Sequence, residues 1–255
     1  ETQPVPAIAT ALRDLVTDVV RQAMEGGATA AEAVVGDGSE FSTVVRLGEV
    51  ETLKESGSKA LGVRVFRGKR AASTWTSDLS VEGVHRMVTS ALELAKITSE
   101  DPFSGIPEAD ELGSLPGDLD LYYDDVYSLS NADRIDYARR AEKAAITADP
   151  RIKNSDGGTF DAALGRKVMA NSHGFVGDYQ RSYCSISAVP IAQDENGNMQ
   201  RDYWYSVSRK LGALESPEEV GRIAAERTLR RIGARKVKTA RVPIVFDSNI
   251  SKALL

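Results

Sequence analysis

An Asn-Gly pair between two β-rich segments is the feature of this sequence that most constrains its fold. Asn196-Gly197 separates residues 178–194 from residues 199–210, and both flanking segments are rich in Tyr, Trp, Val, Ile and Ser. Asn-Gly is the strongest short-range signal for a type I′ turn, in which both central residues have positive φ. The segment from Asp178 to Lys210 is therefore predicted to be a β-hairpin with a type I′ turn.

The two arms of this hairpin place different side chains on their two faces. In the first arm, Cys184, Ile186 and Ala188 share one face, and hydroxyl side chains dominate the other. In the second arm, tyrosines alternate with serine and tryptophan. Such a pattern suits a sheet that is covered on both sides, or one whose second face binds something.

Four amphipathic helices are predicted from apolar residues at helical spacing and from capping residues. They are residues 8–23, ended by Gly26-Gly27; residues 81–95, after Asp78 or Ser80; a helix opened by Ser130-Asn-Ala-Asp133; and residues 217–233, opened by a capping box at Ser216-Pro-Glu-Glu219. In the third of these helices, Ala138, Ala141, Ala144 and Ala145 form a smooth face for close packing.

Strands are predicted between the helices, with Gly-rich turns between them. The first half contains Ala31–Val35 and Phe41–Lys54 around a turn at Gly36-Asp-Gly-Ser39, then Leu61–Phe66 and Arg70–Thr76. The second half contains Ile152–Ser155, Thr159–Leu164 and Lys167–Asn171, separated by turns at Asp156-Gly-Gly158 and Gly165-Arg166. A turn at Asn171–Gly174 follows, with His173 suited to a left-handed conformation. Val242–Phe246 is predicted to be a short buried strand.

These elements predict an α+β fold in which antiparallel meanders and hairpins pack against amphipathic helices. We divide the chain into residues 1–98, a Pro- and Gly-rich loop at 99–125, and residues 126–255. The end of the sequence, from Asp247 to Leu255, has the pattern of a helix that has just begun, with Ser248 or Asn249 as N-cap. We therefore expect a substantial C-terminal part to follow Leu255.

Composition narrows the class of protein. The chain has 255 residues, 42% hydrophobic residues and a net charge of −5. These values are typical of a globular protein, and the acidic balance argues against a nucleic-acid-binding surface. No apolar run is long enough for a membrane helix, and no signal-peptide pattern is present. One cysteine fits a reducing compartment, so the cytoplasm is the expected location.

The residues that usually carry chemistry are few. Two histidines and one cysteine cannot build a zinc site without carboxylates, and the spacing of His85, His173 and Cys184 does not bring them together. His85 is interpreted as a packing or surface residue, and Cys184 as a small buried apolar group. Residues 98–125 carry nine carboxylates, which we interpret as a solvated linker because they lack the ligand spacing of a calcium loop. No catalytic or metal-binding residue is predicted.

A series of short segments, in order along the chain, resembles one protein family. They include Gly57–Val65, Thr98–Pro102, Asn154–Gly158, Ala170–Gly174, Glu195–Asp202 and Val242–Phe246. Together they are similar to the TldD/PmbA family, whose members have been called modulators of DNA gyrase and look like metallopeptidases. The Thr-Ser-x-Asp-Pro, Asn-Ser-His-Gly and Asn-Gly-x-Met-x-Arg-Asp segments resemble the PmbA branch, also called TldE.

The resemblance implies that this chain is the N-terminal part of a two-part protein with a β-rich C-terminal domain. In TldD-type members, a His-Glu-x-x-x-His motif follows the segment that matches Val242–Phe246, and a later cysteine completes a zinc site. PmbA-type members lack these ligands. The sequence stops at Leu255, at or before that point, so no metal ligand is assigned here and zinc is expected in a TldD-type partner.

The implied function is that of a non-catalytic subunit in a TldD–TldE heterodimer that cleaves unfolded or flexible peptides. A homodimer is the other assembly considered. If the hairpin lines the peptide chamber, Tyr183, Tyr203 and Tyr205 are the candidate peptide contacts, although core packing also explains them. Two alternatives stay open: a binding or regulatory protein that acts on gyrase or a toxin–antitoxin system without proteolysis, and a zinc peptidase whose own ligands lie beyond Leu255.

Overall fold

The computed structural model describes residues 5–113 and 117–251. Its elements, in chain order, are α1 Val5–Glu25, β1 Ala30–Arg46, β2 Glu49–Arg67, β3 Arg70–Thr76, α2 Val81–Ile97, η1 Asp124–Tyr127, α3 Asn131–Thr147, β4 Ile152–Asn171, β5 Val176–Gln193, β6 Met199–Arg201, β7 Trp204–Ser208, η2 Leu211–Ala213, α4 Pro217–Leu229 and α5 Ser248–Ser251. Four helices and a long antiparallel sheet confirm the predicted α+β class. Within the described residues, no helix combines the length and hydrophobicity needed to cross a membrane.

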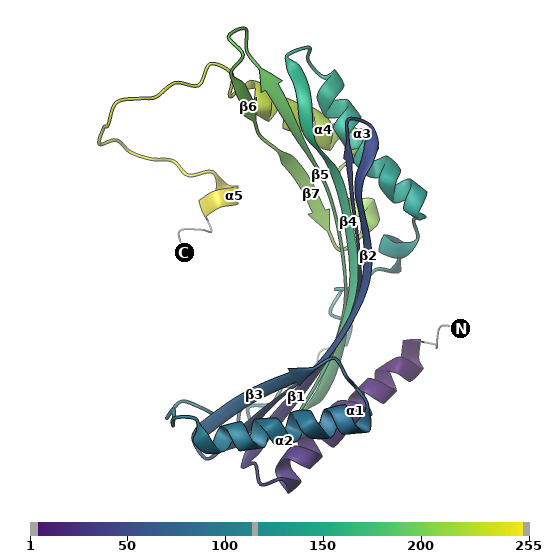
Figure 1. Ribbon diagram of the computed structural model, residues 1–255, viewed down its shortest axis with the longest axis vertical. Coiled ribbons are helices and arrows are strands. Elements are labelled where there is room, and N and C mark those ends of the chain that lie inside the picture. Colours follow the sequence, from purple (N-terminus) through teal and green to yellow (C-terminus); the bar gives the residue numbers. More distant parts are fainter. Residues whose placement is uncertain (1–4, 114–116, 252–255) are drawn as a thin grey trace.

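All seven strands belong to one sheet, in the order β3-β2-β1-β4-β5-β6, with β7 also paired to β5. The four long strands β1, β2, β4 and β5 run the length of the molecule and bend as they go (Figure 1). Every pair of neighbouring strands among the described residues is antiparallel. The long strands therefore connect the two ends of the molecule, and each end carries its own pair of helices.

Strand β1 passes without interruption through residues 36–39, so the turn predicted there is wrong. Gly36 and Gly38 are paired with β2 on one side and with β4 on the other. Hydrogen bonding from two neighbours outweighs the turn preference of glycine. The hairpin turn lies instead at Leu47-Gly48, where both residues have positive φ, 52° and 85°. Because Arg46 pairs with Glu49, this is a two-residue loop of the I′ kind.

Strand β4 is also continuous over 20 residues, so the turns predicted at 156–158 and 165–166 are wrong. Between Ser155 and Gly158 the register against β5 shifts by one residue, and Gly157 has a φ of 114°. The Asp-Gly-Gly sequence therefore forms a β-bulge within a strand. The turn predicted at Asn171–Gly174 is confirmed, but Gly174, with a φ of 94°, takes the left-handed conformation in place of His173.

The hairpin that contains Asn196-Gly197 is present, but its predicted turn type is wrong. Gln193 pairs with Met199, so the loop has five residues, and only Gly197 among them has positive φ (82°). The Asp194 carboxylate accepts hydrogen bonds from the backbone N–H groups of Asn196 and Asn198, at 2.9 and 2.8 Å. This side-chain cap on the loop stabilises a longer connection than Asn-Gly alone predicts.

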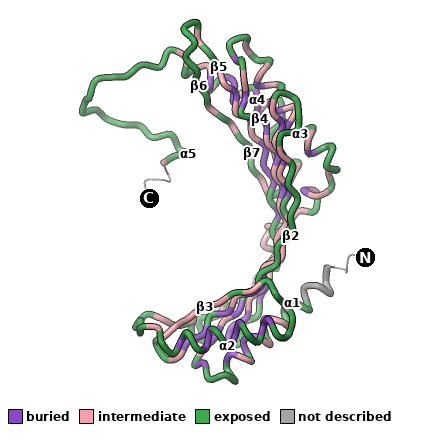
Figure 2. Tube along the Cα trace, in the orientation of Figure 1, coloured by how far each residue is buried: buried purple, intermediate pink, exposed green. Residues whose placement is uncertain are grey.

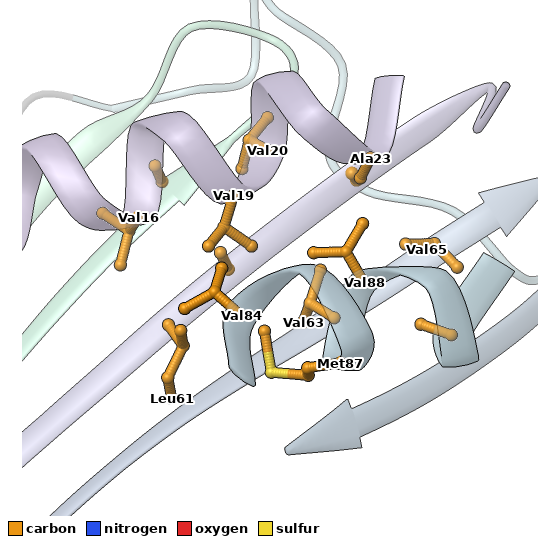
Figure 3. Close-up of a cluster of buried hydrophobic side chains, with 14 of the residues drawn as sticks. Val16, Val19, Val20, Ala23, Leu61, Val63, Val65, Val84, Met87 and Val88 are labelled. Carbon is orange, nitrogen blue, oxygen red and sulfur yellow. The ribbon is translucent and has the colours of Figure 1, made fainter. Parts of the chain in front are cut away.

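Both helix pairs cover the same face of the sheet. Buried residues alternate along β1 at one parity, from Ala31 and Val35 at one end to Phe41 and Val45 at the other. Helices α1 and α2 close the core at one end, where Val16, Val19, Val63, Val84 and Val88 are among the side chains that meet (Figure 3). Helices α3 and α4 cover the other end. The purple, buried positions in Figure 2 follow these two regions.

The predicted N-terminal caps of three helices are confirmed. The hydroxyls of Ser80, Ser130 and Ser216 each accept a hydrogen bond from a backbone N–H in the first turn of the helix that follows. Ser130 and Asp133 form a reciprocal capping box. Helix α4 ends at Leu229, earlier than predicted, and Gly233 follows with a φ of 77°.

The segment after α4 differs from its prediction. Val242–Phe246 contains no strand, and its apolar side chains are exposed, Val245 by 96%. Figure 1 shows the chain between α4 and α5 as a long loop that stands apart from the sheet. A buried strand requires a neighbouring strand to pair with, and the described residues place none beside it. A helix is present where one was predicted, but α5 includes Ser248, so neither Ser248 nor Asn249 is its N-cap and the helix begins slightly earlier than predicted. Leu254 and Leu255 lie outside the described residues.

Candidate functional site

The face of the sheet opposite the helices forms a hollow of about 820 Å³. Side chains on this face come from even positions of β1 and β2 and from odd positions of β4, β5 and β7, because the other parity packs under the helices. Small residues at the middle of the sheet, including Gly36, Gly38, Ala60, Ala163 and Gly165, make the hollow possible. We call this surface the open face.

The three tyrosines predicted as peptide contacts all lie on the open face. Tyr183, Tyr203 and Tyr205 are exposed by 43%, 51% and 40%, so none of them is a core residue. The rings of Tyr203 and Tyr205 stack with centroids 6.2 Å apart. Tyr183 lines the hollow, whereas the two stacked tyrosines lie outside its lining. The three side chains therefore share one face, but only Tyr183 belongs to the hollow itself.

Asp161 of β4 is a functional candidate that the sequence analysis did not identify. Ser42 and Ser185 lie opposite it on the neighbouring strands β1 and β5. Ser42 Oγ donates to Asp161 Oδ1 at 2.6 Å, and Ser185 Oγ donates to Oδ2 at 3.2 Å. Two neutral hydroxyls therefore hold the carboxylate in place without neutralising its charge. Glu40, two residues along β1 from Ser42, adds a second carboxylate to the same region of the hollow.

Basic side chains line the other part of the hollow. Arg181 of β5 is paired with Gly165, and a Cβ added at Gly165 would lie 3.4 Å from Arg181 Nε. The arginine side chain therefore extends across the glycine. Lys167 lies two residues further along β4. Along β1, β4 and β5 the open face thus separates negative from positive charge. Arg209 lines the hollow at its β7 edge, after Ser208, which pairs with Cys184, and so lies at the level of Tyr183.

These charged residues could have been found if β4 had been interpreted as one strand. Asp161, Ala163, Gly165 and Lys167 alternate with Ala162, Leu164 and Arg166, which lie on the other face of the strand. Placing turns at 156–158 and 165–166 broke that alternation in the sequence analysis. The residues around Arg181 in the sequence do not indicate that its side chain lines the hollow, because its position there follows from the pairing of β5 with β4.

The histidines and the cysteine lie apart from the open face. His85 is exposed on α2, which confirms a surface role. His173 lies in the turn before β5, with Nδ1 2.7 Å from the carbonyl oxygen of Pro107. Cys184 is fully buried under α3 and α4, as predicted for a small apolar group. Within residues 5–113 and 117–251, no three His, Cys, Asp or Glu side chains are grouped closely enough to hold a metal ion.

Cys184 is expected to be unreactive while the protein is folded. Burial raises the pKa of its thiol from 9.0 to about 11, which lowers the thiolate fraction at pH 8 by roughly 100-fold. Reaction with Ellman's reagent should therefore be slow in buffer and fast in urea. Since the pKa is higher in the folded state, the thiol also favours folding below pH 9 and loses that effect as pH rises toward 11. Equal labelling rates in buffer and in urea would contradict the burial of this residue.

Two protein-family models match the chain, one in its N-terminal part and one in its C-terminal part. Residues 31–95 match PmbA/TldA metallopeptidase domain 1, and residues 124–232 match the PmbA/TldA metallopeptidase central domain. The chain is 38% identical to Metalloprotease PmbA of Escherichia coli O157:H7 over 247 residues, which covers 96% of this chain and 54% of that protein. It is 34% identical to a Metalloprotease PmbA homolog of Haemophilus influenzae, over 96% of this chain and 53% of the homolog.

Solved structures share the fold. A proposed modulator of DNA gyrase from Bacteroides thetaiotaomicron superposes with a TM-score of 0.81 at 22% identity, over 89% of this chain and 51% of that one. TldE from Thermococcus kodakarensis superposes with a TM-score of 0.72 at 16% identity, over 84% and 47%. The chain therefore spans about half the length of the relatives it matches. On the strength of its identity with the two PmbA proteins across nearly all of its length, the chain belongs to the PmbA/TldD metallopeptidase family as a PmbA/TldE-type member.

Proposed function

We propose that this chain is a non-catalytic subunit of a zinc peptidase, which pairs with a TldD-type partner and helps to hold a flexible peptide substrate. The observation that carries the proposal is the open face: a long, uncovered sheet surface that presents aromatic side chains and charged groups. Family membership supplies the chemical context, since the two PmbA relatives are named metalloproteases. Exposed tyrosines offer large rigid surfaces at low entropic cost, which suits the binding of peptides of varied sequence.

The zinc expected in this family is not matched by a ligand set in the described residues. We therefore derive no catalytic step from them and assign them binding roles only. An extended peptide could lie along the open face, with tyrosines contacting its side chains and charged groups fixing its position. This role requires exposed, pre-ordered side chains, and Asp161 and the stacked pair Tyr203 and Tyr205 meet that requirement.

The test is a reconstitution with an unfolded reporter peptide. This protein, a TldD-type partner and their equimolar mixture are each incubated with the peptide, and the products are separated by mass. We expect cleavage by the mixture well above the sum of the separate proteins. Zinc measured by mass spectrometry should be found with the partner. A matched mixture uses a partner whose His-Glu-x-x-x-His glutamate is changed to glutamine, which removes the general base.

Other outcomes point to the alternatives. Stoichiometric zinc bound by this protein alone, with cleavage in the absence of the partner, would overturn the non-catalytic assignment in favour of a peptidase that carries its own ligands. Association with gyrase or with an antitoxin, without any gain in cleavage, would favour the regulatory function.

The exposed tyrosines are tested separately. Tyr183→Ala should raise the KM of the mixture for the peptide while leaving its kcat unchanged, because the substitution removes a binding contact only.

A further inference from the structure

The hollow on the open face has a charge pattern that restricts the peptides it can accept. Glu40 and Asp161 lie toward the α3–α4 end, and Arg181 and Lys167 lie toward the α1–α2 end. Among the described residues, none of these four side chains takes part in an ion pair. Unpaired charges that line a concave surface are available to a ligand, and their mutual separation defines what the ligand must carry.

The separation follows from the sheet register. Arg181 pairs with Gly165, which lies four residues from Asp161 on β4. At about 3.3 Å per residue, Asp161 and Arg181 are about 13 Å apart along the sheet. Glu40 pairs with Ala163, four residues from Lys167, so the second acidic and basic groups have the same separation along the strands. An extended peptide has the same rise per residue, so two of its side chains on one face, four residues apart, match this distance.

The hollow between the two rows also fits a backbone. Ala163 lies between Asp161 and Gly165 on β4, and its small side chain keeps the sheet surface low between the acidic and the basic row, whereas Gly38 and Gly165 belong to the row of Arg181 itself. The ring of Tyr183 and the side chain of Val207 form the wall on the β7 side. A chain lying in the hollow could therefore approach the strands closely while its end side chains reach the two rows.

We propose that the hollow binds an extended peptide segment that carries a basic side chain and an acidic side chain four residues apart. The basic group pairs with Asp161, which Ser42 and Ser185 hold in position, and with Glu40. The acidic group pairs with Arg181 and Lys167. This inference names the substrate class of the proposed peptide-binding function and rests on it.

The experiment measures binding by this protein alone, so that it is independent of cleavage and of any partner. Four capped peptides of equal length carry, at positions one and five, lysine and glutamate, lysine and glutamine, glutamine and glutamate, or glutamine twice. Isothermal titration calorimetry at low salt should give the lowest Kd for the lysine–glutamate peptide. Each charged side chain of the peptide should lower the Kd about fivefold relative to glutamine at the same position. The difference in affinity between the four peptides should become smaller at higher salt concentration, because salt screens ion pairs at a protein surface.

Two variants assign each charge to its partner. In Asp161→Asn, exchanging the peptide lysine for glutamine should weaken binding less than it does in the unmodified protein, because only Glu40 is left to pair with the lysine, whereas exchanging the glutamate should have its full effect. In Arg181→Gln, the opposite pattern is expected. Asn can still accept a hydrogen bond from Ser42, and thermal melting of each variant confirms that it is folded. Asp14→Asn, the same change at an exposed position on α1, is the matched control and should bind all four peptides as the unmodified protein does.

The proposal is overturned if the four peptides bind equally, or if neither variant changes the ranking. Binding of the lysine–glutamine peptide as tight as that of the lysine–glutamate peptide would also overturn it, because it would show that the hollow recognises the basic side chain alone. If the ranking holds while reconstitution yields no cleavage, the peptide site stands and the peptidase assignment fails. If cleavage is reconstituted while the ranking fails, the subunit role stands and this site is rejected.

Discussion

Replacing Gly158 by alanine is expected to destabilise the fold by about 3 kcal/mol, because the added methyl group has no space. A Cβ at this position would lie 2.1 Å from the carbonyl oxygen of Ala138 and 3.0 Å from the backbone nitrogen of Glu142. Both atoms belong to the backbone of α3, so no change of rotamer relieves the contact. Helix α3 would have to move away from β4, which would open the core between Phe160 and the alanine face of the helix.

Thermal unfolding followed by circular dichroism tests this prediction. For a chain of this size, a loss of about 3 kcal/mol corresponds to a fall in Tm of roughly 6–12 °C. Gly36→Ala is the control: Gly36 also lies within a long strand, and a Cβ there meets no atom within 4 Å. It should leave Tm nearly unchanged. If the two variants melt together, α3 does not approach β4 as closely as the structure indicates.

A similar close approach occurs on a neighbouring side of α3, where the helix meets α4. A Cβ at Gly221 of α4 would lie 2.3 Å from the carbonyl oxygen of Ala141. Small residues on both contact surfaces thus let α3 pack tightly between β4 and α4. This explains why the third helix is rich in alanine, the feature from which close packing was predicted.

Removing the carboxylate of Glu142 should cost about 3 kcal/mol, because two hydrogen bonds to a charged group are lost. Glu142 is 1% exposed, and its two oxygens accept from the backbone N–H groups of Leu47 and Gly48, at 2.7 and 2.9 Å. Leu47 has a φ of 52°, a conformation that costs a non-glycine residue about 1 kcal/mol or more. The buried carboxylate therefore holds the β1–β2 turn in a conformation that its sequence does not favour.

Urea unfolding of Glu142→Ala and Glu142→Gln tests this role. Glutamine keeps one acceptor oxygen and presents an N–H group to the second donor, so its loss should be about half that of alanine. Amide hydrogen exchange at Leu47 and Gly48 should accelerate in both variants, which distinguishes loss of the turn from general destabilisation. Asp136→Ala, at an exposed site on the same helix, serves as the control. Unchanged exchange at the turn would show that Glu142 does not stabilise it.

Local chemistry determined the features that were predicted correctly. Ser80, Ser130 and Ser216 bond to the backbone of their own helices, so their roles depend on residues only a few positions away. The alternation that buries Cys184 and exposes Tyr183 follows from strand geometry alone, and it held in the structure. The partners in these interactions are only a few residues apart in the sequence, so a single segment is enough to predict them.

The open face could be predicted only in part. The sequence put Tyr203 and Tyr205 on one face of the second hairpin arm and identified Tyr183 of the first arm as a further candidate contact, without establishing that the three side chains share a face. It did not bring Asp161 to Ser42 and Ser185, because that contact joins three strands up to 119 residues apart in sequence. The opposition of Asp161 and Arg181 across the hollow likewise depends on the register between β4 and β5, which no single segment specifies.

The sequence by itself determined where α2, α3 and α4 begin, which residues of the Cys184 segment face inward, and that the fold is α+β. Tertiary structure decided which glycines lie in turns and which lie in strands. Gly36 and Gly38 continue strand β1, and Gly158 of β4 leaves space for helix α3. The turn between β1 and β2 lies at Leu47-Gly48 instead. The physical reason is that a central strand gains hydrogen bonds from both neighbours, and this gain exceeds a local preference for turning. Val242–Phe246 shows the converse, because an apolar segment becomes a strand only where another strand lies beside it.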